Sequence, residues 1–445
     1  MNFIADQQTL DDLNLLGKYK PNSIFSIFNQ VITGGGEKLL AHMFRNPMTD
    51  PVQINERSST IAYFQAQQIS FPFSKEQLII MEDYFHEASQ MGLLATGFNV
   101  LKKQLLAISV KDQQYEQLHL GIISTVQVLK ELRNFLNQLE PAETALTYLS
   151  SIKSLEDILS NKRVKELLVQ IGSVKTIGLT QIVQYDHLLR NVLQKEMKAV
   201  LGIIHYLDVY LAVAGVAQRQ SFSYAQALPN DNLELHVEQM RHPSIENAVG
   251  NLTTMHQHSN MIFLTGANMA GKSTFMKALG IAVYLAHMGF PVATANMRFS
   301  VKDGIYSSIN VPDNLNLGLS HFYAEVLRVK KVAEEVSSGK KLLVIFDELF
   351  KGTNVKDAHD ATYSITEAFS RYKNCFFIIS THIIEVAEAF KRENHIQFQY
   401  LPTIMDGLVP MYTYQLTQGV TADRQGMMII ENEGILKLIT GINSI

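Results

Sequence analysis

The sequence predicts a multidomain α and α/β protein, with a helical domain over residues 1–225 and an α/β domain over residues 226–445. Three observations predict this division. Apolar residues recur at helical spacing through the first half, short apolar runs alternate with helical segments in the second half, and one of those runs leads into a glycine-rich loop. Apolar residues make up 47% of the 445, which is enough for a sizeable core in each domain.

The helical half contains one long uninterrupted segment, residues 184–218, which lacks proline. At about 1.5 Å per residue, this segment predicts a rod of roughly 50 Å. A helix of that length is typical of a lever or a long bundle rather than of a small core. Its apolar positions have helical spacing: Leu189, Val192, Leu193, Val200, Ile204, Leu207 and Leu211.

The α/β half begins after a polar connector, "SFSYAQALPNDN", at residues 221–232. Each apolar run that follows is continuous rather than alternating, as expected for parallel strands that are buried on both faces. Helical segments lie between the runs, so a parallel sheet is predicted. The predicted strands are "MIFLT" (261–265), "KLLVIF" (341–346), "CFFIIS" (375–380) and a further one within "VPMYTYQLTQG" (409–419).

Composition and charge favour a cytoplasmic protein that is not bound to a membrane. The formal net charge is −4, so binding to nucleic acid would need a local basic patch. The single cysteine, Cys375, excludes a disulfide within the chain and lies in an apolar run. The most apolar long segment, residues 278–293, is too short for a bilayer and contains Pro291, so we expect a buried helix there.

The loop "GANMAGKST" (266–274) matches the phosphate-binding pattern G-x-x-x-x-G-K-[ST], with a predicted strand before it and a predicted helix after it. Glycines at both ends let the loop curl so that backbone N–H groups point at phosphate. Lys272 is expected to reach the β- and γ-phosphates of ATP, and the Ser273 hydroxyl to ligate Mg²⁺. The predicted nucleotide-binding residues are Gly266, Ala267, Asn268, Met269, Ala270, Gly271, Lys272, Ser273 and Thr274.

Two further motifs follow buried strands and indicate hydrolysis rather than binding alone. Asp347 and Glu348 end the strand at 341–346, and we expect Asp347 to hold Mg²⁺ and Glu348 to orient and deprotonate the attacking water. Thr381 and His382 follow the strand at 375–380. His382 is therefore expected beside the same phosphates, where it would sense the γ-phosphate.

Taken together, "TGANMAGKST", "DELFKGTN" and "STHIIEVAE" resemble the motifs of the MutS family of DNA mismatch repair ATPases. "RHPSIE" (241–246) resembles the segment that precedes the nucleotide domain in that family. The resemblance extends into the first half, through "TLDDLNLL" (9–16), residues 23–57 and residues 203–217. It implies a helical core and lever domain followed by an ABC-type P-loop ATPase domain, with a reduced or absent clamp.

The resemblance also implies a dimer with composite ATP sites. "DNLNLGLSHFYAEV" (313–326) resembles the family segment whose serine reaches the nucleotide of the partner, so Ser320 is expected to act in trans. Several positions depart from the family pattern: Ala267 replaces proline, His321 replaces threonine, and Phe350 and Lys351 replace glycine and arginine. None of these changes removes an atom that the ATPase chemistry needs.

The resemblance leads to two hypotheses for what the ATPase controls. Family members that recognise mismatches carry two domains before the core, whereas the core pattern begins here near residue 9. The first hypothesis is therefore a homodimer that closes on double-stranded or branched DNA under the control of ATP, without reading mismatches. The second is a nucleotide-switched scaffold or heterodimer partner that binds no DNA.

The basic residues form no stripe with interleaved aromatic side chains. Lys102 with Lys103, "NKRVK" (161–165), Lys195 with Lys198 and "KRENH" (391–395) each fit an ordinary solvated surface. Any contact with DNA is therefore expected to be weak, salt-sensitive and directed at phosphates.

Overall fold

The chain forms two compact units. The α/β unit comprises residues 1–27, 44–58 and 219–445, and the helical unit comprises residues 28–43 and 59–218. The computed structural model describes residues 3–17, 22–86, 91–110, 113–139, 146–172, 177–229, 233–267, 269–309, 321–391, 393, 395–406, 409–421, 430 and 433–440.

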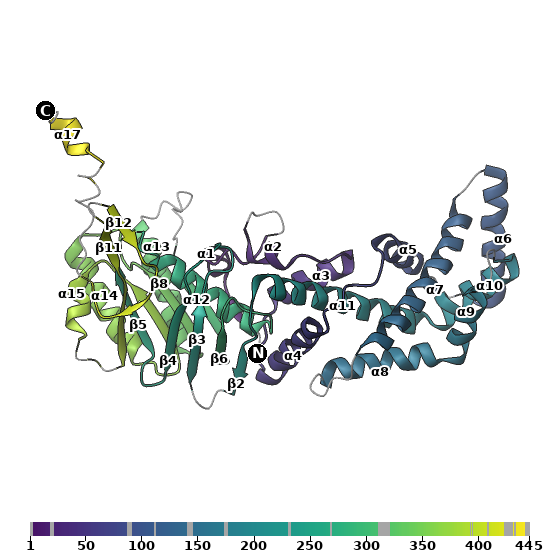
Figure 1. The fold of residues 1–445 in the computed structure, drawn as a ribbon, viewed down its shortest axis with the longest axis horizontal. Coiled ribbons are helices and arrows are strands. Elements are labelled where there is room, and N and C mark those ends of the chain that lie inside the picture. Colours follow the sequence, from purple (N-terminus) through teal and green to yellow (C-terminus); the bar gives the residue numbers. More distant parts are fainter. Residues whose placement is uncertain are drawn as a thin grey trace. The chain divides into compact units, whose positions relative to one another are not determined.

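A seven-stranded sheet forms the centre of the α/β unit (Figure 1). Every neighbouring pair in it is parallel except the last, in which β13 runs antiparallel to β10. In spatial order the strands are β1 (Ile4–Ala5), β7 (Gly304–Ser308), β8 (Leu342–Asp347), β9 (Phe376–Ser380), β5 (Met261–Gly266), β10 (Ile396–Leu401) and β13 (Thr417–Gln418).

The three central strands confirm the prediction from continuous apolar runs. β5 and β9 are buried at every position, and β8 is buried at every position but its last, Asp347. The single strand predicted within residues 409–419 is instead two strands, β12 (Val409–Tyr412) and β13. They are separated by Tyr414, whose φ of 55° cannot continue an extended strand.

Helix α12 (Lys272–His287) lies between the central sheet and a second sheet of four strands. It contacts β5, β7 and β8 on one side and β2 and β3 on the other, and almost all of its residues are buried. This confirms the buried helix that we predicted over the start of residues 278–293. The second sheet has the order β2 (Gln226–Leu228), β6 (Asn296–Ser300), β3 (Glu234–Met240) and β4 (Asn251–His256), and β11 (Thr403–Asp406) pairs separately with β12.

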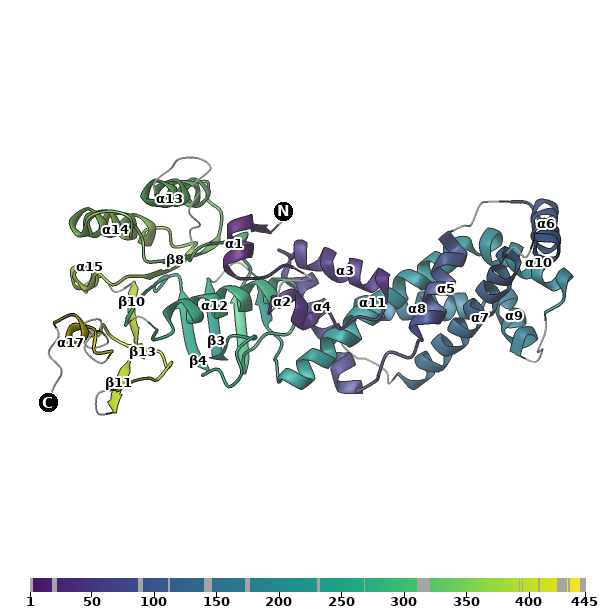
Figure 2. The ribbon, with the colours of Figure 1, turned by 90° about the horizontal axis from the view of Figure 1, so that it is seen from above.

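The opposite face of the central sheet is covered by three helices (Figure 2). Apolar side chains of these helices pack on β8 and β9 in one core, which includes Val332, Phe369 and Phe390. The unit therefore has four layers, which are the four-stranded sheet, helix α12, the seven-stranded sheet and the three covering helices. The covering helices are α13 (His321–Ser337), α14 (Val355–Ser370) and α15 (Ile384–Ala389), and α17 (Ile435–Thr440) lies near the end of the chain.

The N-terminal residues belong to the α/β unit, which differs from the predicted division at residue 225. β1 extends the central sheet by pairing with β7, and α1 (Gln7–Asp12) follows it directly. Helix α2 (Ile24–Phe28) and the start of α4 (Pro51–Gln67) lie largely within the same unit. Helical pattern alone assigned these segments to the first half, because periodicity does not report which partner a helix packs on.

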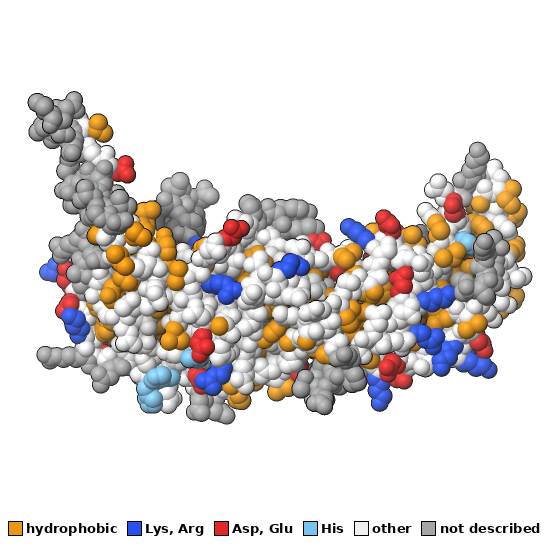
Figure 3. Space-filling model, in the orientation of Figure 1, with side chains coloured by type: hydrophobic (Ala, Val, Ile, Leu, Met, Phe, Trp, Pro, Cys, Tyr) orange, Lys and Arg blue, Asp and Glu red, His pale blue; other side chains and the backbone are white. Residues whose placement is uncertain are grey.

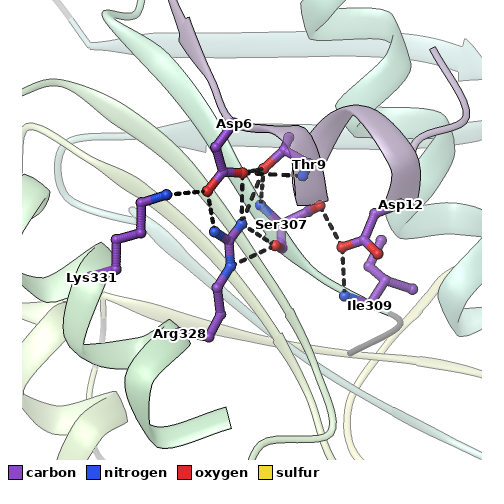
Figure 4. A network of polar contacts seen from close by, with 7 residues as sticks. All are labelled: Asp6, Thr9, Asp12, Ser307, Ile309, Arg328 and Lys331. Carbon is purple, nitrogen blue, oxygen red and sulfur yellow. Dashed lines mark hydrogen bonds and ion pairs between the residues drawn. The ribbon is translucent and has the colours of Figure 1, made fainter. Parts of the chain in front are cut away.

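A buried polar network holds α1 against β7 and α13 (Figure 4). The guanidinium of Arg328 makes an ion pair with Asp6, and its Nε donates to the carbonyl oxygen of Ser307 over 3.1 Å. Asp6 also accepts from the Lys331 amine at 2.7 Å and, as the N-cap of α1, from the backbone N–H of Thr9 at 3.1 Å. At the other end of α1, the Asp12 carboxylate accepts from Ser307 Oγ at 2.7 Å.

Replacing Asp6 with asparagine is expected to lower the free energy of unfolding by about 3 kcal/mol, because Arg328 would keep its buried charge without its main counter-ion. Burial opposes ionisation of Asp6, but bonds from Arg328 and Lys331 outweigh it and hold its pKa well below the ordinary 3.8. The stabilisation is therefore present above about pH 4 and is lost as the pH falls further.

Urea denaturation of wild type and Asp6→Asn between pH 3 and pH 7 measures both effects. Asp11→Asn is the matched control, because Asp11 lies on the same helix but is exposed. Equal stability of the wild type and Asp6→Asn at pH 7 would contradict this account of the network.

All elements described in the helical unit are helices (Figures 1 and 2). Buried Asp208 on α11 accepts from the backbone N–H groups of Ile32 and Thr33, at 3.0 and 2.7 Å, and so fixes the start of α3. The helices are most of α3 (Gly34–Arg45), the rest of α4, α5 (Lys75–His86), α6 (Leu93–Val110), α7 (Gln114–Gln138), α8 (Leu146–Ser160), α9 (Lys162–Gly172), α10 (Leu179–His187), a π-helical turn η1 (Leu188–Val192) and α11 (Gln194–Gln220).

The predicted continuous rod over residues 184–218 is wrong, because η1 interrupts it. The π turn is closed by a bond from the Leu193 N–H to the Leu188 carbonyl at 2.8 Å. Within it, Arg190 turns inward and donates to both oxygens of Asp186, at 2.6 and 2.9 Å. Tyr84 donates to the same carboxylate at 2.8 Å, so a buried polar cluster accompanies the break in the helix.

Helix α11 is, among the residues that the structure describes, the one helix long and apolar enough to suit a membrane span. Of its most apolar window, 56% is buried inside the fold. Core helices of that length pass the same test, and the buried share of α11 fits a core helix of its unit.

Candidate active site

The polar residues of the site are brought together by the ends of three adjacent parallel strands. In the register of the sheet, Ser380 at the end of β9 lies beside Leu264 of β5 on one side and Asp347 of β8 on the other. The carboxyl ends of β5, β9 and β8 therefore meet at one edge of the sheet. In parallel α/β sheets, this edge is where ligands bind.

The glycine-rich loop leaves β5 and turns into α12 through left-handed backbone conformations. Gly266 has a φ of 144° and Gly271 a φ of 102°, both of which favour glycine. Between them, Met269 has a φ of 70° and a side chain that is 75% exposed. The predicted residue Asn268 lies outside the described residues, whereas Ala267 and Ala270 of the loop are buried against Leu401.

Lys272 is buried, and its side chain curls back over the loop. Its Nζ donates to the carbonyl oxygens of Gly266 and Ala267, at 2.8 and 3.1 Å. Burial lowers the pKa of this amine, and the charges of Glu348 and Asp347 act against that shift. The loop therefore encloses the Lys272 amine, at a position where the amine could contact a phosphate group bound by the loop.

Ser273 and Asp347 meet directly at the start of α12. The Ser273 hydroxyl donates to Asp347 Oδ2 over 2.5 Å, and Ser380 Oγ donates to the other carboxylate oxygen. These are hard oxygen donors of the kind that Mg²⁺ prefers. No group of three or more His, Cys, Asp and Glu side chains suited to a metal occurs in the described residues, so an ion here would complete its shell with water and phosphate.

Glu348 lies next to Asp347 and contacts two basic side chains. Its carboxylate contacts His382 Nε2, and it accepts from Lys351 Nζ at 2.7 Å. Burial opposes its ionisation, but the bonds from His382 and Lys351 outweigh burial and hold the pKa of Glu348 at about 2. A carboxylate with such a pKa accepts hydrogen bonds well but removes protons poorly at neutral pH.

The backbone around Glu348 is held in an unfavourable conformation. Glu348 has a φ of 54° and Phe350 a φ of 63°, which non-glycine residues adopt at a cost of about 1 kcal/mol or more each. Gly352 follows, and a Cβ atom there would lie 2.8 Å from the backbone nitrogen of Phe322 on α13. The turn after β8 therefore packs closely on the first turn of α13.

The predicted trans-acting residue, Ser320, lies outside the described residues. It directly precedes α13, the helix whose first turn packs on Gly352. The structure thus brings together Lys272, Ser273, Asp347, Glu348 and His382, and it leaves the place of Ser320 a prediction.

A cavity of about 440 Å³ opens beside the loop and was not predicted from the sequence. It is lined by Gly271 and Thr274 of the loop and helix and by the ring of Tyr414, which packs within 3.1 Å of the position that a Gly271 Cβ would take. Burial and the charge of Lys277 lower the pKa of His242, another lining residue, to about 4, so its imidazole is neutral. Other lining residues are Ile245, Ala248, Val249, Asn251, Phe275 and Leu401.

Asn251 fixes the Tyr414 side of this cavity. Its amide donates to the Tyr414 carbonyl at 3.0 Å and accepts from the Leu416 N–H at 2.6 Å. Tyr414 is 163 residues from Asn251 in the sequence, so no spacing could have shown that it lines one cavity with Asn251 and His242. The only signal in the sequence was that "RHPSIE" (241–246), which contains His242, resembles a segment of the family pattern.

Fold and site define a protein of helical and α/β units, the latter carrying a glycine-rich phosphate-loop motif at the end of a buried parallel strand. The family model described as MutS domain III matches residues 8–214, and the model described as MutS domain V matches residues 262–441. The chain therefore belongs to the MutS family, as the sequence motifs predicted.

Several curated relatives are similar over much of the chain. The DNA mismatch repair protein MutS of Pseudothermotoga lettingae is 23% identical over 95% of this chain and 62% of its own length. The DNA mismatch repair protein MSH3 of Candida glabrata is 24% identical over 86% of this chain and 40% of its own length. MutS of Clostridioides difficile is 30% identical over a shorter match, 46% of this chain and 22% of that protein. The matches thus span less than two thirds of these relatives.

Proposed function

We propose that this chain is an ATP-binding and ATP-hydrolysing protein of DNA mismatch repair type, with an ABC-type P-loop site formed at a dimer interface. The observation that carries the proposal is the convergence of Lys272, Ser273, Asp347 and Glu348 at the ends of β5 and β8. A phosphate loop alone would fit nucleotide binding, whereas the two carboxylates and His382 also supply groups for hydrolysis.

The loop would bind the triphosphate through its backbone N–H groups and the N-terminus of α12. Lys272 would exchange its bonds to Gly266 and Ala267 for bonds to the β- and γ-phosphates. The cavity lined by Tyr414 and neutral His242 adjoins Thr274, so the nucleoside would lie there, with the base against the Tyr414 ring.

Ser273 and Asp347 would hold Mg²⁺, the serine directly and the carboxylate directly or through water. When bound, the ion would neutralise charge on the transferring phosphoryl group. The bond from Ser380 to the outer oxygen of Asp347 would keep the carboxylate turned toward Ser273.

Glu348 would orient the attacking water. Lys351 and His382 each contact one of its oxygens, and the remaining lone pairs could accept a bond from water. Opening either contact would make the carboxylate a stronger acceptor for that water. Opening would also raise its pKa toward the operating pH, which favours proton acceptance. His382 would then be free to contact the γ-phosphate, as the sequence predicts.

Ser320 of a second copy would complete the site, so we propose a homodimer whose nucleotide state biases the helical units. DNA would contact this dimer weakly and through phosphates. The exposed basic residues at the start of α9, Lys162, Arg163 and Lys165, are the strongest candidates for such contacts, and Figure 3 shows Lys and Arg side chains gathered over that part of the helical unit.

The test is an ATPase and binding assay with homoduplex, mismatched and branched DNA between 50 and 300 mM salt. We expect DNA to bind at low salt, to raise turnover and to lose affinity steeply with salt, without preference for mismatches. ATP hydrolysis that no DNA changes, together with no DNA binding at 50 mM salt, would favour the alternative of a nucleotide-switched scaffold or heterodimer partner.

A further inference from the structure

Helix α6 (Leu93–Val110) carries a row of large apolar side chains that are exposed in the described part of the structure. Its inner face, which includes buried Thr96 and Val100, packs on α7 and α10. Its outer face carries Leu94, Phe98, Leu101, Leu105 and Ile108, which are 91%, 73%, 46%, 66% and 77% exposed. Figure 3 shows apolar side chains gathered over α6.

The spacing of this row is that of a two-helix seam. Successive members are four, three, four and three residues apart, which is the heptad pattern of positions that meet a facing helix. A single stripe of this kind is narrower than the apolar face that a membrane-surface helix buries. All five side chains of the row are apolar. The row therefore fits a facing helix whose apolar side chains have the same spacing.

The row is also large enough for a specific contact. Five side chains at these exposures offer on the order of 500 Å² of apolar surface, near the upper limit for a patch on a monomer. Two copies together would bury about 1,000 Å² or more, which is the lower bound of specific protein interfaces. Because α6 is already folded against α7 and α10, pairing would not have to form the helix first.

We propose that the outer face of α6 pairs with α6 of a second copy of this chain. Two copies related by a two-fold axis bring identical residues near that axis. If the whole row pairs in register, Leu101, the middle member of the row, lies close to Leu101 of the other copy in either helix orientation. This contact lies in the helical unit, needs no nucleotide and does not rest on the proposed ATPase activity.

Light scattering of the 445-residue chain without nucleotide tests the oligomeric state at about 10 μM, a concentration that populates a dimer with a low-micromolar dissociation constant. We expect wild type to form a dimer and Phe98→Glu/Leu105→Glu to raise the dimer dissociation constant by about 100-fold or more. Leu252→Glu is the control, since Leu252 is 57% exposed on strand β4 of the other unit. A monomeric wild type, or a double variant as dimeric as wild type, would overturn the proposal.

Disulfide formation provides a second readout that does not depend on destabilising a variant. The chain's only cysteine, Cys375, is buried, so wild type should not cross-link under mild oxidation. Leu101→Cys is expected to cross-link almost completely, and Leu252→Cys is expected not to. Equal cross-linking of both variants would refute the pairing. Co-sedimentation of a monomeric wild type with phosphatidylcholine vesicles would also refute it and would indicate that the row binds a membrane surface.

Discussion

Glu348→Gln is expected to lower ATP turnover by about 100-fold or more, which is the usual contribution of a group that orients and activates the attacking nucleophile. The variant removes a carboxylate that lies beside Asp347 and is held by Lys351 and His382. Because Lys272, Ser273 and Asp347 are unchanged, ATP affinity should stay within about threefold of wild type. Steady-state phosphate release and titration with a fluorescent ATP analogue measure the two quantities.

The matched control is Glu388→Gln, which removes an exposed carboxylate that pairs only with Lys391 in the described structure. It should leave turnover and ATP affinity unchanged. Turnover of Glu348→Gln equal to that of wild type would show that Glu348 is not part of the hydrolytic machinery, although the loop would still be a nucleotide site. This outcome would leave the α6 pairing untouched.

Lys272→Ala is expected to weaken ATP binding by about 100-fold, or about 2.7 kcal/mol. Its amine is the cation enclosed by the loop, and hydrogen bonds to charged groups contribute about 1.5–3 kcal/mol each. The loop should remain folded, because Gly266 and Gly271 supply its left-handed conformations and its own Ala267 and Ala270 stay packed against Leu401. Equilibrium binding of ATP with Mg²⁺ measures the change.

Lys330→Ala is the control for this prediction, since Lys330 is 69% exposed on α13 and pairs only loosely with Glu334, at 3.9 Å. It should bind ATP as wild type does. If Lys272→Ala also bound ATP like wild type, the loop would not be the nucleotide site. The Mg²⁺-binding roles proposed for Ser273 and Asp347 would then be refuted as well.

The two variants separate binding from chemistry. Lys272→Ala should lose both binding and turnover, whereas Glu348→Gln should lose turnover alone and accumulate the ATP-bound state. If ATP binding closes the proposed dimer across Ser320, Glu348→Gln with ATP should show the closed form most clearly. This comparison requires no knowledge of the DNA partner.

Local signals along the chain were enough to predict several parts of the structure. Continuous apolar runs identified β5, β8 and β9, because strands buried on both faces cannot alternate polar and apolar residues. The loop at 266–274 and the carboxylates at 347 and 348 were visible because a phosphate loop and a strand end have fixed spacing. Since parallel strands end at one edge, their convergence followed from the pattern as well.

The contacts between residues far apart in the sequence could be found only in the folded chain. Asp6 and Arg328 form an ion pair, and His242 and Tyr414 line one cavity, but no spacing along the chain links either pair. Periodicity also predicted an unbroken helix through residue 190, where the pairing of Arg190 with Asp186 accompanies a π turn. Helical spacing likewise marks an apolar face without telling whether the fold covers it. In α6 the fold leaves that face exposed, because burial is a property of the packed chain and not of the segment.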